Sequence, residues 1–399
     1  MKPFANRLLN LGTETAFAVS AQARAWADKG NKVYPFHLGD IKLPTPPNII
    51  EAANKFCRDG KNVYCPAEGI PELRNALADD VGKKRGVSYS TDQVSVQPGG
   101  KPTIGKFIQT VMNPGDEVLY PNPGYPIYES QIEYQGGKAV PYHYFETDSG
   151  FDIDLEELKN SITDKTVALI YNNYQNPIGA ESSQSEMEAI ADIVIEHDLW
   201  MLSDDAYYEV RYGIKPKSIV AIPGMRERTV ILYTFSKRFA MTGWRLGASV
   251  GPKELIENIS RLNVNDESCT NHFLQWAMIE ALTGDQSGPQ KLLDLLQRRR
   301  DAAVEGLNAI DGTQIATPNS TFYLFPNVTS IMKRKGFTNL KDLQVQALEQ
   351  SGVSFCMREH FGRPNPNEKD YFIRFAYSGI SEEEIREGMA KLKTYFESS

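Results

Sequence analysis

Short apolar runs alternate with helix-patterned segments from about residue 90 to residue 250. These runs are rich in β-branched and aromatic residues, which favour strands. The expected strands are 93–97, 117–122, 166–172, 199–204 and 229–236, and a helix is expected over 185–197. Strands separated by helical segments are typical of an α/β sheet with helices on both faces. In such a sheet, ligands gather at the carboxyl ends of the strands.

The C-terminal part has a different pattern. Residues 289–309 carry apolar positions at helical spacing, and β-type runs follow at 321–328 and 371–378. The first forty or so residues are expected to fold back onto this tail, because neither piece is large enough to form a core alone. The sequence therefore predicts a large domain with a mostly parallel sheet and a smaller α+β domain built by both termini. The large domain is expected to span 48–288, and the small domain 1–47 plus 289–399.

Composition narrows the class of protein. The 399 residues are 41% hydrophobic and 24% charged, with a net charge of -8, which is ordinary for a globular protein and unsuited to nucleic-acid binding. The start lacks a signal-peptide core, and no apolar run approaches the ~20 residues that cross a bilayer. The four cysteines show no paired spacing that suggests disulfides or a metal site. We expect a cytoplasmic protein with no metal, membrane or nucleic-acid partner.

One lysine has unusual neighbours. In TFSKRFAMTGWRLG (234–247), Lys237 lies next to the hydroxyls of Thr234 and Ser236, and Arg245 follows eight residues later. This grouping suits a small aldehyde that carries a phosphate. Gly99 and Gly100 end another strand and open a helix, where a phosphate could meet bare backbone N–H groups, although a tight turn explains two glycines equally well.

Three further side chains are ambiguous on their own. Asp204 ends an expected strand and is either a cap for the next segment or a buried carboxylate that holds a proton on a heterocyclic nitrogen. Asn176 and Tyr207 are explained equally well as a turn residue and a packed aromatic. The residue pattern alone leaves these alternatives open.

Eight motifs occur along the chain in the order found in a known family, and this resemblance decides between the alternative roles of Asp204, Asn176 and Tyr207. From about residue 30 to residue 390 the chain resembles the class I/II aminotransferases, pyridoxal 5'-phosphate enzymes of fold type I. The motifs are YCPAEGIPELR (64–74), PGGK (98–101), NPGDEV (113–118), PNPGYPIYE (121–129), NPIG (176–179), SDDAYYE (203–209), SKRFAMTGWRLG (236–247) and IRFAYSG (373–379).

The resemblance implies a cofactor site. Lys237 would form the Schiff base and move the Cα proton, and Asp204 would keep the pyridine nitrogen protonated. Asn176 and Tyr207 would bond the ring's phenolic oxygen, and Tyr125 would stack on the ring. The residues expected around the phosphate are Gly100, Lys101, Thr234, Ser236, Arg245 and, from a partner subunit, Tyr64.

The resemblance also implies a substrate site and a reaction. Arg374 would bind the substrate α-carboxylate beside the Gly39 backbone. We expect a homodimer with shared active sites that transaminates an L-amino acid with a 2-oxo acid through aldimine and quinonoid intermediates. A non-catalytic regulator that binds pyridoxal phosphate is a remote alternative, since neither terminus has room for a DNA-binding module.

Some residues depart from the family pattern and point to a cationic substrate. Glu14, Asp266 and Glu267 are candidates to face the substrate side chain, which would favour arginine, although exposed helix ends explain the last two equally well. His37 is either a packed histidine or a second proton-transfer group with catalytic function. With Glu14, that second reading fits an arginine oxidase that uses dioxygen, which is the alternative function.

Overall fold

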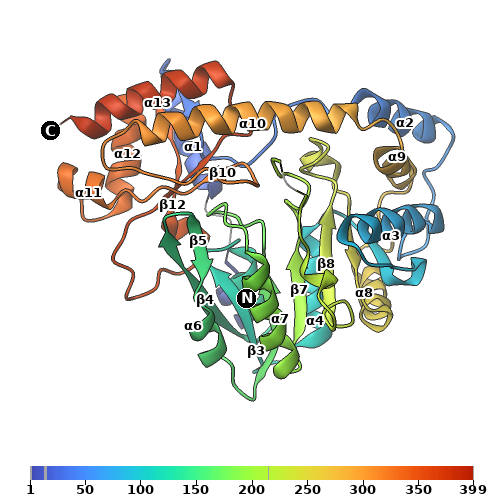
Figure 1. The fold of residues 1–399 in the computed structure, drawn as a ribbon. Coiled ribbons are helices and arrows are strands. Elements are labelled where there is room, and N and C mark those ends of the chain that lie inside the picture. The colour runs from blue at the N-terminus through green and yellow to red at the C-terminus, as the bar shows by residue number, and fades with distance from the viewer. Residues whose placement is uncertain (1, 13–15, 214, 399) are drawn as a thin grey trace.

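The computed structural model describes residues 2–12, 16–213 and 215–398. Its centre is an eight-stranded sheet (Figure 1) in the order β2-β9-β8-β7-β6-β3-β4-β5. The five strands β4, β3, β6, β7 and β8 run parallel to one another. At the two ends of the sheet, β9 is antiparallel to β8 and β2, and β5 is antiparallel to β4. Their bounds are β2 (Val94–Gln97), β3 (Glu117–Asn122), β4 (Lys138–Thr147), β5 (Gly150–Ile153), β6 (Thr166–Tyr171), β7 (Trp200–Asp204), β8 (Thr229–Thr234) and β9 (Gly247–Val250).

Helices cover both faces of this sheet, and the strands alternate accordingly. In β8, Val230 and Leu232 pack with α4 (Lys101–Val111), α5 (Ile127–Tyr134) and α8 (Lys253–Asp266), while Ile231 and Tyr233 pack in the core on the opposite face. That second face is covered by α3 (Pro71–Arg85), α6 (Leu155–Asn160), α7 (Gln184–Glu196) and α9 (His272–Thr283), with α2 (Pro47–Arg58) packed on α9. Successive side chains of a strand point to opposite faces of the sheet, and here both faces are buried. This explains why the strands are nearly continuous apolar runs.

Both ends of the chain build the smaller part of the molecule. Tyr34 in β1 (Tyr34–Pro35) pairs with Val353 in β11 (Val353–Ser354), and Tyr34 and Phe36 are buried in the same core as Phe375. A second small sheet has the order β10-β13-β12. The remaining elements of this part are α1 (Ala16–Ala27), β10 (Tyr323–Leu324), α11 (Thr329–Lys335), α12 (Leu340–Ser351), β12 (Cys356–Met357), β13 (Ile373–Ala376) and α13 (Glu382–Glu397).

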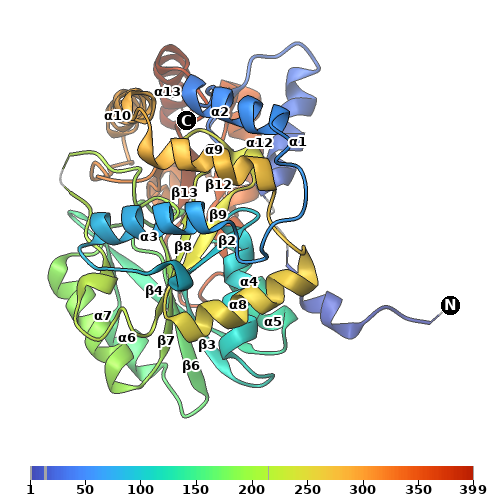
Figure 2. The same cartoon turned by 90° about the vertical axis from the view of Figure 1, so that its right-hand side faces the viewer.

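One long helix joins the two parts. Figure 1 shows α10 (Ser287–Asn308) running from the side of α2 and α9 to α13, against which it packs. The α/β fold with a large, mostly parallel sheet is as predicted, whereas the domain boundaries stay a prediction. Figure 2 shows the N-terminal segment, including the 3-10 turn η1 (Asn6–Asn10), reaching outward past α5. In the described ranges, every helix is too short or too polar to span a bilayer.

Candidate active site

A cavity of about 520 Å³ opens where β6, β7 and β8 end. Its walls come from both parts of the molecule, because β8 contributes Thr234 and β13 contributes Arg374. Predicted site residues that line it are Gly39, Gly100, Lys101, Tyr125, Asn176, Asp204, Tyr207, Thr234, Ser236, Lys237, Arg245 and Arg374. Residues far apart in the sequence therefore meet at the carboxyl edge of the sheet, which is the place expected for a ligand.

Lys237 follows β8 and extends across the cavity to the N-terminal segment. Its Nζ donates to the carbonyl of Gly39 at 3.2 Å and lies 5.9 Å from the ring centre of Tyr207. Gly39 is required there, since a Cβ would lie 2.2 Å from the Tyr323 hydroxyl oxygen. The amine is thus held at the boundary between the two parts of the molecule, facing the cavity.

Asp204 lies buried at the end of β7. The Tyr128 hydroxyl donates to its Oδ2 at 2.6 Å, and the Ala206 backbone N–H donates to its Oδ1 at 3.1 Å. Burial raises the pKa of Asp204 to about 6, and the charge of Asp205 adds to the rise, while both hydrogen bonds and Lys237 lower it. At neutral pH the group is an ionised carboxylate in a buried place, which needs a cationic or N–H partner.

The other end of the cavity has the chemistry of a phosphate cradle. Gly100 precedes α4, whose first backbone N–H groups and positive helix end attract an anion. Gly99 has a φ of 100°, and a Cβ there would lie 2.2 Å from the Arg245 guanidinium. The Thr234 hydroxyl donates to Ser236 Oγ at 2.9 Å. Two close glycines, a helix start, hydroxyls and an arginine fit a phosphate monoester.

Arg374 is the buried cation of the opposite wall. Its Nη1 donates to Asn176 Oδ1 at 3.0 Å and its Nη2 to the His37 carbonyl at 2.8 Å. The guanidinium lies 4.5 Å from the ring centre of Tyr323, whose hydroxyl is 2.7 Å from that of Tyr207. Its buried Nε has no hydrogen-bond partner among the residues that the structure describes. An unsatisfied N–H on a buried, oriented guanidinium suits a carboxylate ligand.

His37 supports this arginine with its backbone and turns its ring away. The Nδ1 atom is 2.6 Å from Ser354 Oγ, and the ring is not among the described groups lining the cavity. Burial, with the charges of Lys42 and Arg374, lowers the pKa of His37 to about 4. The ring is therefore neutral at physiological pH, and this placement gives no support to the predicted second proton-transfer group.

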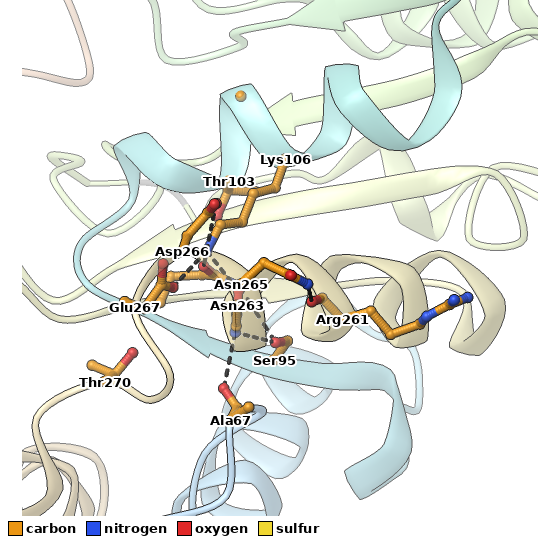
Figure 3. Close-up of polar contacts among 12 residues, drawn as sticks. Ala67, Ser95, Thr103, Lys106, Arg261, Asn263, Asn265, Asp266, Glu267 and Thr270 are labelled. Carbon is orange, nitrogen blue, oxygen red and sulfur yellow. Dashed lines mark hydrogen bonds and ion pairs between the residues drawn. The ribbon is translucent and has the colours of Figure 1, made fainter.

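Asp266 and Glu267 also lie away from the cavity, contrary to the expected substrate contact. Figure 3 shows both at the end of α8, facing Lys106 of α4. Lys106 Nζ is bonded to Glu267 and donates to Asn263 Oδ1 at 2.7 Å, with Asp266 3.9 Å away. Their charges are directed at a buried lysine of the same chain, and this placement gives no support to the expected contact with a cationic substrate. Glu14 lies outside the described residues.

Tyr64 does not reach the cavity of its own chain. Its side chain is 85% exposed, and it is absent from the described lining residues. A phosphate contact from this residue therefore requires a second chain, as predicted from the resemblance.

Several lining residues were missed by the sequence reasoning: Phe17, Asp40, Tyr128, Thr242, Tyr323, His360 and Phe361. Tyr128 had a weak signal, because it belongs to the same motif as Tyr125, which precedes α5, and the two ring centres lie 5.8 Å apart. His360 had none, since its position depends on the packing of the C-terminal part. Burial, followed by the charges of Arg374 and Lys341, lowers its pKa to about 4.

Together, the fold and the site define a class of enzyme. A lysine amine, a buried carboxylate and a phosphate cradle within one cavity fit pyridoxal 5'-phosphate, and the family model for aminotransferase class I and II matches residues 31–392. The chain belongs to this family and is a pyridoxal phosphate-dependent enzyme of fold type I. Its activity is transfer of an amino group from an amino acid.

Individual relatives are similar to this protein in sequence or structure along almost the whole chain. The sequence is 32% identical over 402 residues to the probable aspartate/prephenate aminotransferase of Aquifex aeolicus (strain VF5), with 99% of each chain covered. The alanine aminotransferase from Pyrococcus furiosus superposes with a TM-score of 0.91 at 28% identity, covering 99% of both chains. The aspartate aminotransferase from Thermus thermophilus with maleate has a TM-score of 0.88 at 28% identity, covering 99% of this chain and 100% of that one.

Proposed function

We propose that this enzyme transfers the amino group of an L-amino acid with a carboxylate side chain, such as aspartate, to a 2-oxo acid. The observation that carries this choice is the charge of the cavity. Among the described lining residues, four are lysine or arginine (Lys101, Lys237, Arg245, Arg374) and only two are acidic (Asp40, Asp204). An electropositive cavity attracts anionic substrates and disfavours a cationic side chain.

Lys101 is the cation proposed to select the substrate. The resemblance places Lys101 at the phosphate, and we assign it to a distal carboxylate instead. Arg245 is assigned to the phosphate, Arg374 to the α-carboxylate and Lys237 to the covalent bond with the cofactor. Its Nζ lies 5.6 Å from the ring centre of Tyr125 on the cavity wall. The relatives named for aspartate, one of them solved with the dicarboxylate maleate, support the proposed class of substrate.

The roles of the remaining residues follow from their contacts. When bound, pyridoxal 5'-phosphate supplies an aldehyde that condenses with amines and a ring that accepts the electron pair left when the Cα proton departs. Lys237 Nζ takes that proton and later returns it. Asp204 holds a proton on the ring nitrogen, while Asn176 orients Arg374 so that the substrate carboxylate is fixed.

Arginine preference and the oxidase alternative are not supported. The first depended on Glu14, Asp266 and Glu267, of which the last two face Lys106. The second depended on His37 and Glu14, and the His37 ring is bonded to Ser354. Glu14 lies outside the described residues. The relatives reported above are named as aminotransferases.

A homodimer with shared active sites is part of the proposal. The exposed fraction is 85% for Tyr64, 89% for Phe4 and 87% for Leu9, which is unusual for large apolar or aromatic side chains. A second copy that covers the N-terminal segment and receives Tyr64 would bury all three. We expect the protein to sediment at the mass of a dimer. Disrupting the interface should abolish the dimer and weaken cofactor binding together.

The function is tested by comparing amino donors in the holoenzyme and in Lys101→Met, which keeps the length of the side chain and removes its charge. With 2-oxoglutarate as acceptor, the wild-type kcat/KM should be highest for aspartate. The variant should lose about tenfold or more for aspartate and little for alanine. An equal loss for both donors would assign Lys101 to the phosphate instead. Faster turnover of arginine than of aspartate by the wild type would refute the proposed substrate class.

A further inference from the structure

A fully buried ion pair lies directly behind the cofactor site. Arg85 ends α3, and its guanidinium Nε donates to Asp205 Oδ2 at 2.8 Å, with Nη2 2.7 Å from the same oxygen. The side chains of Arg85 and Asp205 are 1% and 3% exposed. The Tyr208 ring covers the guanidinium, with its centre 3.8 Å away. Neither charge is among the described cavity-lining groups, so neither touches a ligand there.

Asp205 is bound tightly to the turn that carries Asp204. Its Oδ1 accepts from the Ser203 hydroxyl at 2.7 Å, and its backbone N–H donates to the Leu232 carbonyl at 3.2 Å. Asp205 therefore cannot turn to solvent when Arg85 is removed. The Asp205 carboxylate would then lie unpaired one residue from Asp204, in a low-dielectric environment that disfavours ionising both groups.

We propose, resting on the function proposed above, that Arg85 is a positioning residue that neutralises Asp205 and thereby keeps the neighbouring Asp204 carboxylate ionised for the cofactor's ring nitrogen. Two adjacent buried carboxylates oppose each other's ionisation, because like charges disfavour the charged form. A cation on the far side of Asp205 reduces that opposition.

The electrostatic environment of Asp204 supports this role. The charge of Asp205 raises the pKa of Asp204 even in the presence of Arg85, although burial is the larger cause. The groups that oppose the rise are Tyr128, the Ala206 N–H and Lys237. Around Arg85 the other charged or titratable groups are Tyr208, Glu209, Tyr89 and Tyr233. With the pKa of Asp204 already at about 6, a further rise of about one unit would leave much of it protonated at pH 7.

The direction of the charge change separates this role from a structural one. Arg85→Gln and Asp205→Asn break the same ion pair and both weaken the fold. Only the first leaves an extra negative charge beside Asp204, while the second leaves a positive charge that favours the ionised carboxylate. A structural role predicts similar damage at the cofactor site from both variants, whereas charge neutralisation predicts damage from one.

The experiment measures the dissociation constant of pyridoxal 5'-phosphate by dialysing the holoenzyme and titrating the cofactor back, with the visible spectrum recorded from pH 6 to pH 9. For Arg85→Gln we expect cofactor binding at pH 7 to be about tenfold weaker, with a spectrum whose pH dependence shifts upward. Asp205→Asn and the double variant should bind within about threefold of the wild type, and so should Arg85→Lys, which keeps the charge.

Failures of this role and of the underlying site assignment are distinguishable. Asp204→Asn is the reference, because it should weaken cofactor binding whether or not Arg85 acts as proposed. If Asp204→Asn binds the cofactor normally, the proposed cofactor contact fails. If Asp204→Asn binds weakly but Arg85→Gln binds normally, or if Arg85→Gln and Asp205→Asn are equally impaired, the role of Arg85 is refuted. Should Arg85→Gln not fold, impaired binding by Arg85→Lys with normal folding gives the same refutation.

Discussion

Asp204→Asn should make the cofactor-free protein more stable at neutral pH while it weakens the enzyme. The structure holds this carboxylate in a buried site that raises its pKa from 3.8 to about 6. A carboxyl group with a raised folded pKa binds more protons in the native state than in the unfolded state between those pH values. Stability therefore falls as the pH rises from about 4 to 6, and the whole cost is present above pH 6.

The magnitude follows from the two pKa values. A difference of about two units corresponds to about 3 kcal/mol of lost stability, at ~1.36 kcal/mol per unit. With ~2.1 cal/mol/K of unfolding entropy per residue over 399 residues, about 3 kcal/mol shifts Tm by about 4 °C. Asparagine keeps an acceptor for the Ala206 N–H and can bond the Tyr128 hydroxyl, so both neighbours stay satisfied.

The assay is thermal unfolding of cofactor-free protein from pH 4 to pH 8. The wild type should lose Tm relative to Asp204→Asn as the pH rises, up to about 4 °C above pH 6. Asp205→Asn is the matched control, because the same chemical change one residue away removes the partner of buried Arg85 and should destabilise the protein by about 3–5 kcal/mol. An Asp204→Asn protein that is less stable than the wild type at pH 7 would refute the reasoning.

Three further substitutions test other contacts. Arg374→Lys should lower kcat/KM for amino donors about 100-fold with the fold intact by circular dichroism, because lysine cannot present two parallel N–H groups to a carboxylate; an unchanged kcat/KM would remove Arg374 from the substrate site. His37→Gln should keep kcat/KM within about threefold from pH 6 to pH 9, since its ring contacts Ser354. If the variant loses one arm of the pH profile of kcat/KM, His37 has a catalytic role after all. Lys106→Met should reduce stability by about 2–3 kcal/mol in urea unfolding, because Glu267 and Asn263 lose a buried donor; unchanged stability would contradict the contacts in Figure 3.

The strands of the large sheet were predictable from local pattern. The runs at 199–204 and 229–236 became β7 (Trp200–Asp204) and β8 (Thr229–Thr234), because both faces of these strands are buried and their central residues are apolar. The runs at 321–328 and 371–378 gave only Tyr323–Leu324 and Ile373–Ala376. In that smaller part, Phe322 and Tyr377 lie just beyond the ends of β10 and β13 and are buried in the core, with the Tyr377 backbone N–H donating to the Phe322 carbonyl at 3.1 Å. Apolar sequence there extends further than the strands.

The long-range contacts of the acidic residues in and around the site could not be predicted from the sequence. Tyr128 is 76 residues from Asp204, Arg85 is 120 residues from Asp205, and Lys106 is 161 residues from Glu267. No local periodicity relates such pairs, since the packing of helices on the sheet decides them. The expected arginine preference came from this gap: position along the chain indicated where Asp266 and Glu267 lie, but not that a buried lysine draws them away from the cavity.

The cavity exists only when the two ends of the chain pack on the sheet. Lys237 comes from the loop after β8, but its amine is bonded to Gly39 of the N-terminal segment, and Arg374 of β13 is bonded to the His37 carbonyl. Asn176, beyond β6, joins the arginine to the large sheet. Loss of the pairing between β1 and β11 would therefore disorder Arg374 and Lys237 together. Binding of a dicarboxylic substrate should in turn stabilise that pairing, because the ligand is held by groups from both parts of the molecule.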